Sequence, residues 1–150
     1  FDTDYRSERR NWGLLMHQVL AYIHSPADVP RAISAVLVSG DIEAKERNIL
    51  EQKIQEIFAM EEVKEWFNPV YNEMSAVFTE SPMITDKGIL RPDRVIVSGE
   101  KVKIIDFKTG ARSNAHIEQM KIYREALRAM GYDNIESYLL YLENKSIISL

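Results

Sequence analysis

The segment from residue 89 to residue 108 constrains the fold of this chain more than any other, because it predicts a β-hairpin. Residues 89–97 and residues 101–107 are rich in valine and isoleucine, which favour strands. Between them, residues 98–100 (Ser-Gly-Glu) form a turn signal. Two such strands joined by so short a turn are expected to pair antiparallel.

Two carboxylates and one amine lie on this hairpin: Asp93, Asp106 and Lys108. Because side chains alternate between the faces of a strand, Asp106 and Lys108 should share one face. Ile105 and Phe107 should then share the other. An ionised side chain buried without a partner is costly, and a divalent cation with a bound phosphate would compensate these charges. The simpler alternative is an exposed ion pair between Asp106 and Lys108, which contributes little to stability.

Size and composition are typical of a single globular domain covering residues 1–150, with 45% of its residues hydrophobic. The chain has 19 basic and 23 acidic residues, which gives a formal charge of −4. Because nonspecific affinity for nucleic acid comes mainly from Lys and Arg, an acidic domain that acts on DNA needs basic patches, metal ions or a partner. The absence of cysteine excludes disulfides, thiolate catalysis and zinc-thiolate sites.

The sequence predicts a cytoplasmic location. No apolar run approaches the roughly 20 residues of a membrane span, and the start, Phe-Asp-Thr-Asp-Tyr-Arg, does not have the pattern of a signal peptide. Because the chain does not begin with methionine, we expect it to be a piece of a longer polypeptide.

The remaining hydrophobic pattern predicts helices that alternate with strands. Helices are expected over residues 12–23, within 41–67 and over 115–130, and strands over 70–80, 136–143 and 146–150. Prolines at 26 and 30 should end the first helix, and residues 81–88 should form a loop. This order predicts an α/β fold with a central mixed sheet flanked by helices.

Four motifs now resemble a known family. An aspartate followed by Asp-x-Lys looks like the signature of the PD-(D/E)xK nucleases. The forms Arg-Pro-Asp-Arg-Val at 91–95 and Ile-Asp-Phe-Lys-Thr-Gly at 105–110 look like the RecB/AddA branch. Gly-Leu-Leu-Met-His at 13–17 and Gln-Met-Lys-Ile-Tyr at 119–123 stand in the order of that branch. Some related nucleases hold an iron–sulfur cluster with four cysteines, so this chain resembles the branch without one.

The resemblance implies a restriction-endonuclease-like core and a Mg²⁺ site, with Mn²⁺ as a substitute. Asp93 and Asp106 would be metal ligands together with the backbone carbonyl of Phe107, and His17 is a further expected ligand. Lys108 would orient the attacking water and stabilise developing negative charge. The alternative for His17 is a half-buried imidazole bonded to a neighbouring carboxylate.

Gln119 and Tyr123 form a second group of candidates, since they lie one helical turn apart on the same stripe. A buried Gln needs a partner, such as a phosphate, a metal-bound water or a backbone group. The alternative is that Gln119 caps a loop and Tyr123 packs in the core. Similar nucleases often have a glutamate near the strand before the hairpin, and here the candidates are Glu73, which is favoured by its position, and Glu80. An exposed charge at the strand edge is the alternative for both.

Several basic residues are candidates for contacts with the DNA backbone. They flank the expected site or precede the first helix: Arg91, Arg94, Arg112 and Lys87, and Arg6, Arg9 and Arg10. Ordinary solvated charge is the alternative for all of them.

The sequence therefore predicts a Mg²⁺-dependent deoxyribonuclease, an exonuclease in double-strand-break processing and recombinational repair. The resemblance implies a helicase region in the same polypeptide and a second helicase-nuclease subunit as partner. Two alternatives stay open. One is a free-standing restriction or defence nuclease, and the other is a noncatalytic DNA-binding or docking module that keeps the fold.

Overall fold

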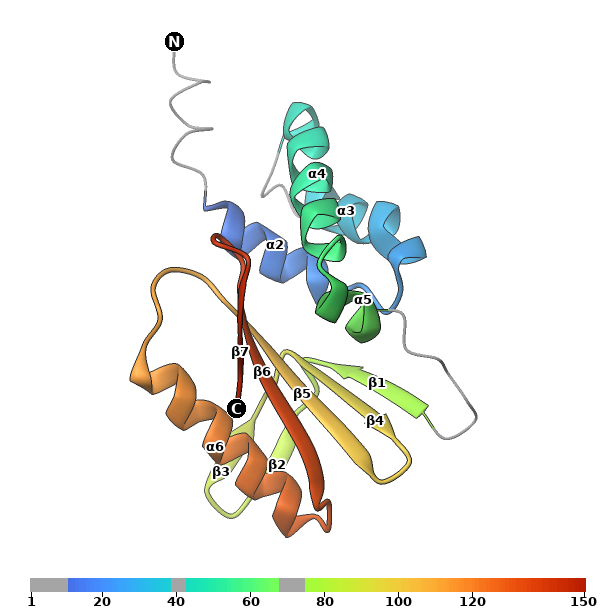
Figure 1. Ribbon diagram of the computed structural model, residues 1–150. Coiled ribbons are helices and arrows are strands. Elements are labelled where there is room, and N and C mark those ends of the chain that lie inside the picture. The colour runs from blue at the N-terminus through green and yellow to red at the C-terminus, as the bar shows by residue number, and fades with distance from the viewer. Residues whose placement is uncertain (1–10, 39–42, 68–74) are drawn as a thin grey trace.

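The computed structural model describes residues 11–38, 43–67 and 75–150. Its centre is a mixed sheet of five strands in the order β1-β4-β5-β6-β7 (Figure 1). The strands are β1 (Ser75–Thr79), β4 (Arg94–Ser98), β5 (Lys101–Lys108), β6 (Asn134–Tyr141) and β7 (Ser146–Ser149). Among the strands of the described residues, only β5 and β6 pair in parallel, and helix α6 (Asn114–Ala129) connects them. The predicted α/β fold with a mixed sheet flanked by helices is confirmed.

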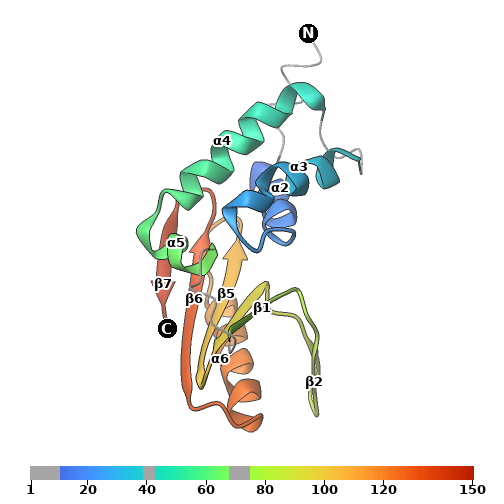
Figure 2. The ribbon, with the colours of Figure 1, turned by 90° about the vertical axis from the view of Figure 1, so that its right-hand side faces the viewer.

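Helices cover both faces of this sheet. Of the α-helices in the described ranges, four lie on one side, namely α2 (Trp12–Leu20), α3 (Val29–Val38), α4 (Arg47–Phe58) and α5 (Glu61–Phe67), while α6 lies on the other (Figures 1 and 2). Ile105 and Phe107 pack with the first group, and Ile104 packs against α6. The predicted alternation along β5 is thus confirmed, and it turns Asp106 and Lys108 toward α6.

Two predictions about the helices were wrong in detail. Helix α3 was not expected, because Pro30 was taken as a terminator. Pro30 instead occupies the second position of α3, where its missing N–H is no loss, because the first N–H groups of a helix have no partner within it. The helix expected within 41–67 is two helices, since α4 ends at Phe58 and α5 begins at Glu61.

The predicted hairpin is confirmed, with Arg94 opposite Ile105 and Ser98 opposite Lys101. Its first strand is shorter than expected, because the strand is interrupted at residues 91–93. Pro92 lacks an N–H for a strand ladder, and the N–H of Asp93 bonds to a side chain.

The residues before this interruption form a second, small hairpin. Strands β2 (Met83–Thr85) and β3 (Gly88–Leu90) pair antiparallel where a loop was expected, and they extend away from the main sheet (Figure 2). The hairpin joins the end of β1 to the start of β4. It therefore separates Glu80 from Asp93 in sequence while leaving their backbones in contact, since the Glu80 N–H donates to the Asp93 carbonyl at 3.1 Å.

Helix α2 begins at Trp12 as expected but ends at Leu20, three residues before the predicted end at 23. The other boundaries agree with the sequence to within about two residues. β1 lies within the predicted 70–80, of which residues 70–74 are outside the described part, and α6 was expected at 115–130. Strands β6 and β7 were expected at 136–143 and 146–150. None of the helices in the described ranges is long and apolar enough to cross a membrane.

Candidate active site

Each of the two aspartate carboxylates accepts a hydrogen bond from a backbone N–H of the opposite segment at the end of β5. The N–H of Asp93 donates to Oδ1 of Asp106 at 2.9 Å, and the N–H of Phe107 donates to Oδ2 of Asp93 at 2.7 Å. These two bonds join the 91–93 segment to β5 where the first strand of the hairpin is interrupted. Both carboxylates therefore have fixed positions, as a metal site requires.

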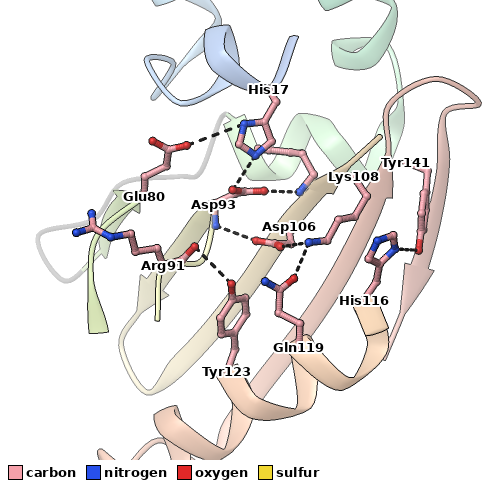
Figure 3. Close-up of polar contacts among 11 residues, drawn as sticks. His17, Glu80, Arg91, Asp93, Asp106, Lys108, His116, Gln119, Tyr123 and Tyr141 are labelled. Atoms are coloured by element: carbon pink, nitrogen blue, oxygen red, sulfur yellow. Dashed lines mark hydrogen bonds and ion pairs between the residues drawn. The ribbon is translucent and has the colours of Figure 1, made fainter. Parts of the chain in front are cut away.

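Lys108 completes the group on the same face (Figure 3). Its Nζ lies 2.9 Å from Oδ2 of Asp106 and donates to Oε1 of Gln119. Asp106 is only 3% exposed and the Lys108 side chain only 17%. The ion pair is therefore not the exposed surface pair that was the simpler alternative, and Asp93, Asp106 and Lys108 converge as predicted.

Burial makes the charge of Asp106 costly. Removal from water, and next the charge of Asp93, raise the pKa of Asp106 from 3.8 to about 6, although Lys108 acts in the opposite direction. The carboxyl group is thus ionised at neutral pH, but at a free-energy cost. A cation bound between the two aspartates would remove that cost.

His17 reaches the aspartates from α2. Its Nε2 lies 2.9 Å from Oδ1 of Asp93, and its Nδ1 lies 4.0 Å from Oε1 of Glu80. The hydrogen bond with Asp93 raises the pKa of His17, and burial opposes this only in part. One ligand atom from each of His17, Glu80 and Asp93 lies within 4.8 Å of the others. Three separate segments of the chain thus supply one cluster, and the half-buried His17 bonded to Asp93 also has the geometry of its alternative.

Gly13 explains how α2 comes so close to β5. A Cβ at this position would stand 2.6 Å from Cγ2 of Thr109, the residue that follows Lys108. Only glycine leaves room for that contact. One turn further along α2, the chain presents His17 to the aspartates, so the spacing of the Gly-x-x-x-His motif has a structural reason.

Gln119 and Tyr123 lie on the face of α6 that covers the site. Gln119 accepts the Lys108 hydrogen bond, while the Tyr123 hydroxyl donates to the Arg91 carbonyl at 3.4 Å. Tyr123 is 4% exposed, and burial, with the charges of both aspartates, raises its pKa. Gln119 therefore holds the lysine. Tyr123 packs in the core, which agrees with the alternative given for it, and its hydroxyl also supports the 91–93 segment.

Arg94 does not agree with its predicted contact with DNA. Its side chain is fully buried, and it donates to the backbone carbonyls of Trp66, Ile23 and His24. The guanidinium also lies 4.0 Å from the centre of the Phe67 ring. Arg94 thus ties β4 to α5 and to the segment that follows α2, because five rigid donors suit several carbonyls at once.

The other expected contacts divide by exposure. Arg91, Arg112 and Lys87 are exposed, and their contacts with DNA stay predictions. Glu73 and the arginines at 6, 9 and 10 lie outside the described residues.

The sequence favoured Glu73 over Glu80 as the glutamate of the site. It adopts a positive φ of 48°, a strained conformation for this residue type. A register argument could have found it, because Thr79 pairs with Arg94 and residue 80 then stands opposite Asp93. His116, to which the sequence gave no role, lies near Lys108.

These donor atoms suit a hard divalent cation. Carboxylate oxygens are the ligands that Mg²⁺ and Mn²⁺ prefer, and a single imidazole is compatible with Mn²⁺. Each carboxylate oxygen carries two lone pairs, so one hydrogen bond leaves capacity for a metal.

A mixed sheet with helices on both faces, carrying an acidic pair and a lysine at the end of its central strand, is the architecture of a restriction-endonuclease-like nuclease. The chain belongs to the PD-(D/E)XK nuclease superfamily, whose sequence model matches residues 2–148. Comparison with curated proteins gave no match. The superfamily consists of nucleases, so DNA is the implied substrate, and a divalent metal ion is their usual cofactor.

Proposed function

We propose that this domain is a Mg²⁺-dependent exodeoxyribonuclease of the RecB/AddA kind that degrades DNA during double-strand-break processing. The observation that carries the proposal is the convergence of Asp93, Asp106 and Lys108 at the end of β5, with Asp106 buried and its charge only partly compensated. Membership of the nuclease superfamily supports the same chemistry.

Asp93 and Asp106 would hold the metal ion, with His17, Glu80 and the backbone carbonyl of Phe107 as further ligands. Glu80 joins this set because of its distance to His17 and Asp93. When bound, the ion neutralises charge on the phosphate and lowers the pKa of a bound water. Mn²⁺ should substitute for Mg²⁺, since it prefers the same ligands.

Lys108 supplies a positive charge at the attacked phosphate in addition to that of the metal ion. Asp106 and Gln119 fix its ammonium group from two sides, so little reorganisation is needed when negative charge develops on the attacked phosphate. Tyr123 supports this arrangement indirectly, through the Arg91 carbonyl.

The four sequence motifs support the RecB/AddA assignment, and the net charge of the domain supports a partner that delivers DNA. The net charge of −4 argues mildly against strong nonspecific binding of DNA by the domain alone, because such binding comes mainly from Lys and Arg. Delivery of the strand by a helicase region in the same polypeptide, or by a second subunit, would overcome this. In this proposal residues 1–150 form one nuclease domain of a longer chain, and Arg91 and Arg112 contact the DNA backbone.

The test uses Asp106→Ala with Asp133→Ala as a matched control, because Asp133 is an exposed aspartate in the turn after α6. Both variants are incubated with end-labelled linear DNA and with covalently closed circular DNA in Mg²⁺. We expect Asp106→Ala to lose degradation while its circular dichroism stays that of the folded protein, and the control to degrade linear DNA only. Full activity of Asp106→Ala would refute the assignment of the metal ligand. Cleavage of circular DNA as fast as linear DNA by the active protein would refute the exonuclease assignment.

A further inference from the structure

A histidine and a tyrosine that the proposed chemistry does not use lie beside Lys108. His116 is in the first turn of α6, and its Nδ1 lies 2.8 Å from the hydroxyl of Tyr141 in β6. Tyr141 is 1% exposed, whereas His116 is partly exposed. Figure 3 shows His116 between Tyr141 and the Lys108–Gln119 pair.

The sheet fixes this placement. Lys108 and Tyr141 are directly paired residues of the parallel strands β5 and β6, so their side chains leave the same face next to each other. Burial, and then the charge of Lys108, lowers the pKa of His116. The imidazole is therefore neutral at neutral pH, and its function depends on which nitrogen carries the proton.

The Tyr141 hydroxyl decides the position of that proton. Within residues 11–38, 43–67 and 75–150, this hydroxyl has His116 as its one hydrogen-bond partner. If it accepted a bond from Nδ1–H, its own buried O–H would stay unsatisfied, which costs free energy. The hydroxyl therefore donates to Nδ1, and the proton of the neutral ring is on Nε2. His116 thus offers an N–H donor at the rim of the site.

A cation lies over the ring of Tyr141. The Arg112 guanidinium lies 6.0 Å from the centre of the Tyr141 ring, and Arg112 is exposed in the loop between β5 and α6. His116 and Arg112 both lie near Tyr141, and a neutral N–H donor together with a guanidinium suits a phosphate, whose oxygens accept from both. The same surface borders Lys108, where the cleaved phosphate is expected.

We propose that Nε2–H of His116, together with Arg112, binds a phosphate of the DNA strand next to the one that is cleaved, and that Tyr141 is a positioning residue that fixes the His116 tautomer. This inference rests on the proposed nuclease function. It adds a substrate contact outside the metal ligands and Lys108.

The experiment is a methylphosphonate scan. Oligonucleotides that each carry one neutral methylphosphonate near the labelled end are bound in Ca²⁺ and followed by fluorescence anisotropy. For the wild type, one replacement flanking the cleaved bond should weaken binding by about tenfold, the effect of one hydrogen bond to a charged group. His116→Ala should bind unmodified DNA more weakly than the wild type by about the same factor. A methylphosphonate at that position should then have no further effect on the binding of this variant. His24→Ala, at an exposed histidine, is the control.

Two measurements separate the contact from a structural role. Nitrogen-15 chemical shifts of His116 should report Nε2–H in the wild type and a mixture of tautomers in Tyr141→Phe. His116→Gln, which keeps a donor, should recover part of the affinity if His116→Ala is poorly folded.

The outcomes are distinguishable from those of the nuclease test. If His116→Ala and His116→Gln both keep the full methylphosphonate sensitivity of the wild type, the phosphate contact is refuted. If the wild type does not cut unmodified DNA in Mg²⁺, the proposed nuclease function fails instead, and the binding scan can still be carried out.

Discussion

Gly13→Ala should impair the candidate site while the protein stays folded. The added Cβ would stand 2.6 Å from Cγ2 and 3.2 Å from Cβ of Thr109, where ordinary contacts exceed 3.4 Å. Such overpacking costs about 1–3 kcal/mol, whereas Ala stabilises a helix by about 1 kcal/mol relative to Gly. The net destabilisation should be at most about 2 kcal/mol, and the protein should stay folded.

The strain is relieved if α2 moves away from β5, and that movement takes His17 away from Asp93. A misplacement of about 1 Å in a catalytic site can cost about 100-fold in rate. We therefore expect the variant to lose roughly two orders of magnitude of nuclease activity and to bind Mn²⁺ more weakly. Urea denaturation, calorimetric titration with Mn²⁺ and cleavage of linear DNA measure the three effects.

A second substitution makes this prediction specific. Thr109→Ala removes the Cγ2 atom that causes the closest contact, so Gly13→Ala with Thr109→Ala should recover most of the activity. Thr109→Ala alone should be near the wild type. Undiminished activity in the single Gly13 variant, or no recovery in the double variant, would show that close approach of α2 to Thr109 is not what positions His17.

Three further predictions concern charge and burial. Arg94→Met should destabilise the protein by about 3 kcal/mol or more in urea denaturation, since three backbone carbonyls lose their donor, while the exposed Arg91→Met should have little effect. Glu80→Gln should weaken Mn²⁺ binding in calorimetric titration by at least about tenfold, which corresponds to about 1.4 kcal/mol. Unchanged affinity would exclude Glu80 as a ligand. In EDTA, stability should fall as pH rises from about 4 to about 6, by up to about 3 kcal/mol, because the folded pKa of Asp106 is above its ordinary 3.8 and the native state binds the extra proton at low pH. Asp106→Asn should lack this part of the pH dependence. If urea denaturation gives the same change in stability between pH 4 and pH 7 for the wild type and for Asp106→Asn, the prediction is refuted.

Local patterns in the sequence were sufficient for much of the site. The alternation along β5 placed Asp106 and Lys108 together, and helical spacing placed Gln119 and Tyr123 on one stripe of α6. These features depend on strand and helix periodicity, which a few neighbouring residues determine.

Other features depend on contacts between distant segments, and only the tertiary structure decided them. His17 and Asp93 are 76 positions apart, and α2 brings them together because Gly13 leaves room for Thr109. Arg94 has the sequence context of a DNA-binding arginine, yet three backbone carbonyls from other elements bury it. Burial also sets the pKa of Asp106. The sequence by itself determined which chemical groups face the same side of each element, whereas the packing of the elements decided which groups meet and how much water they lose.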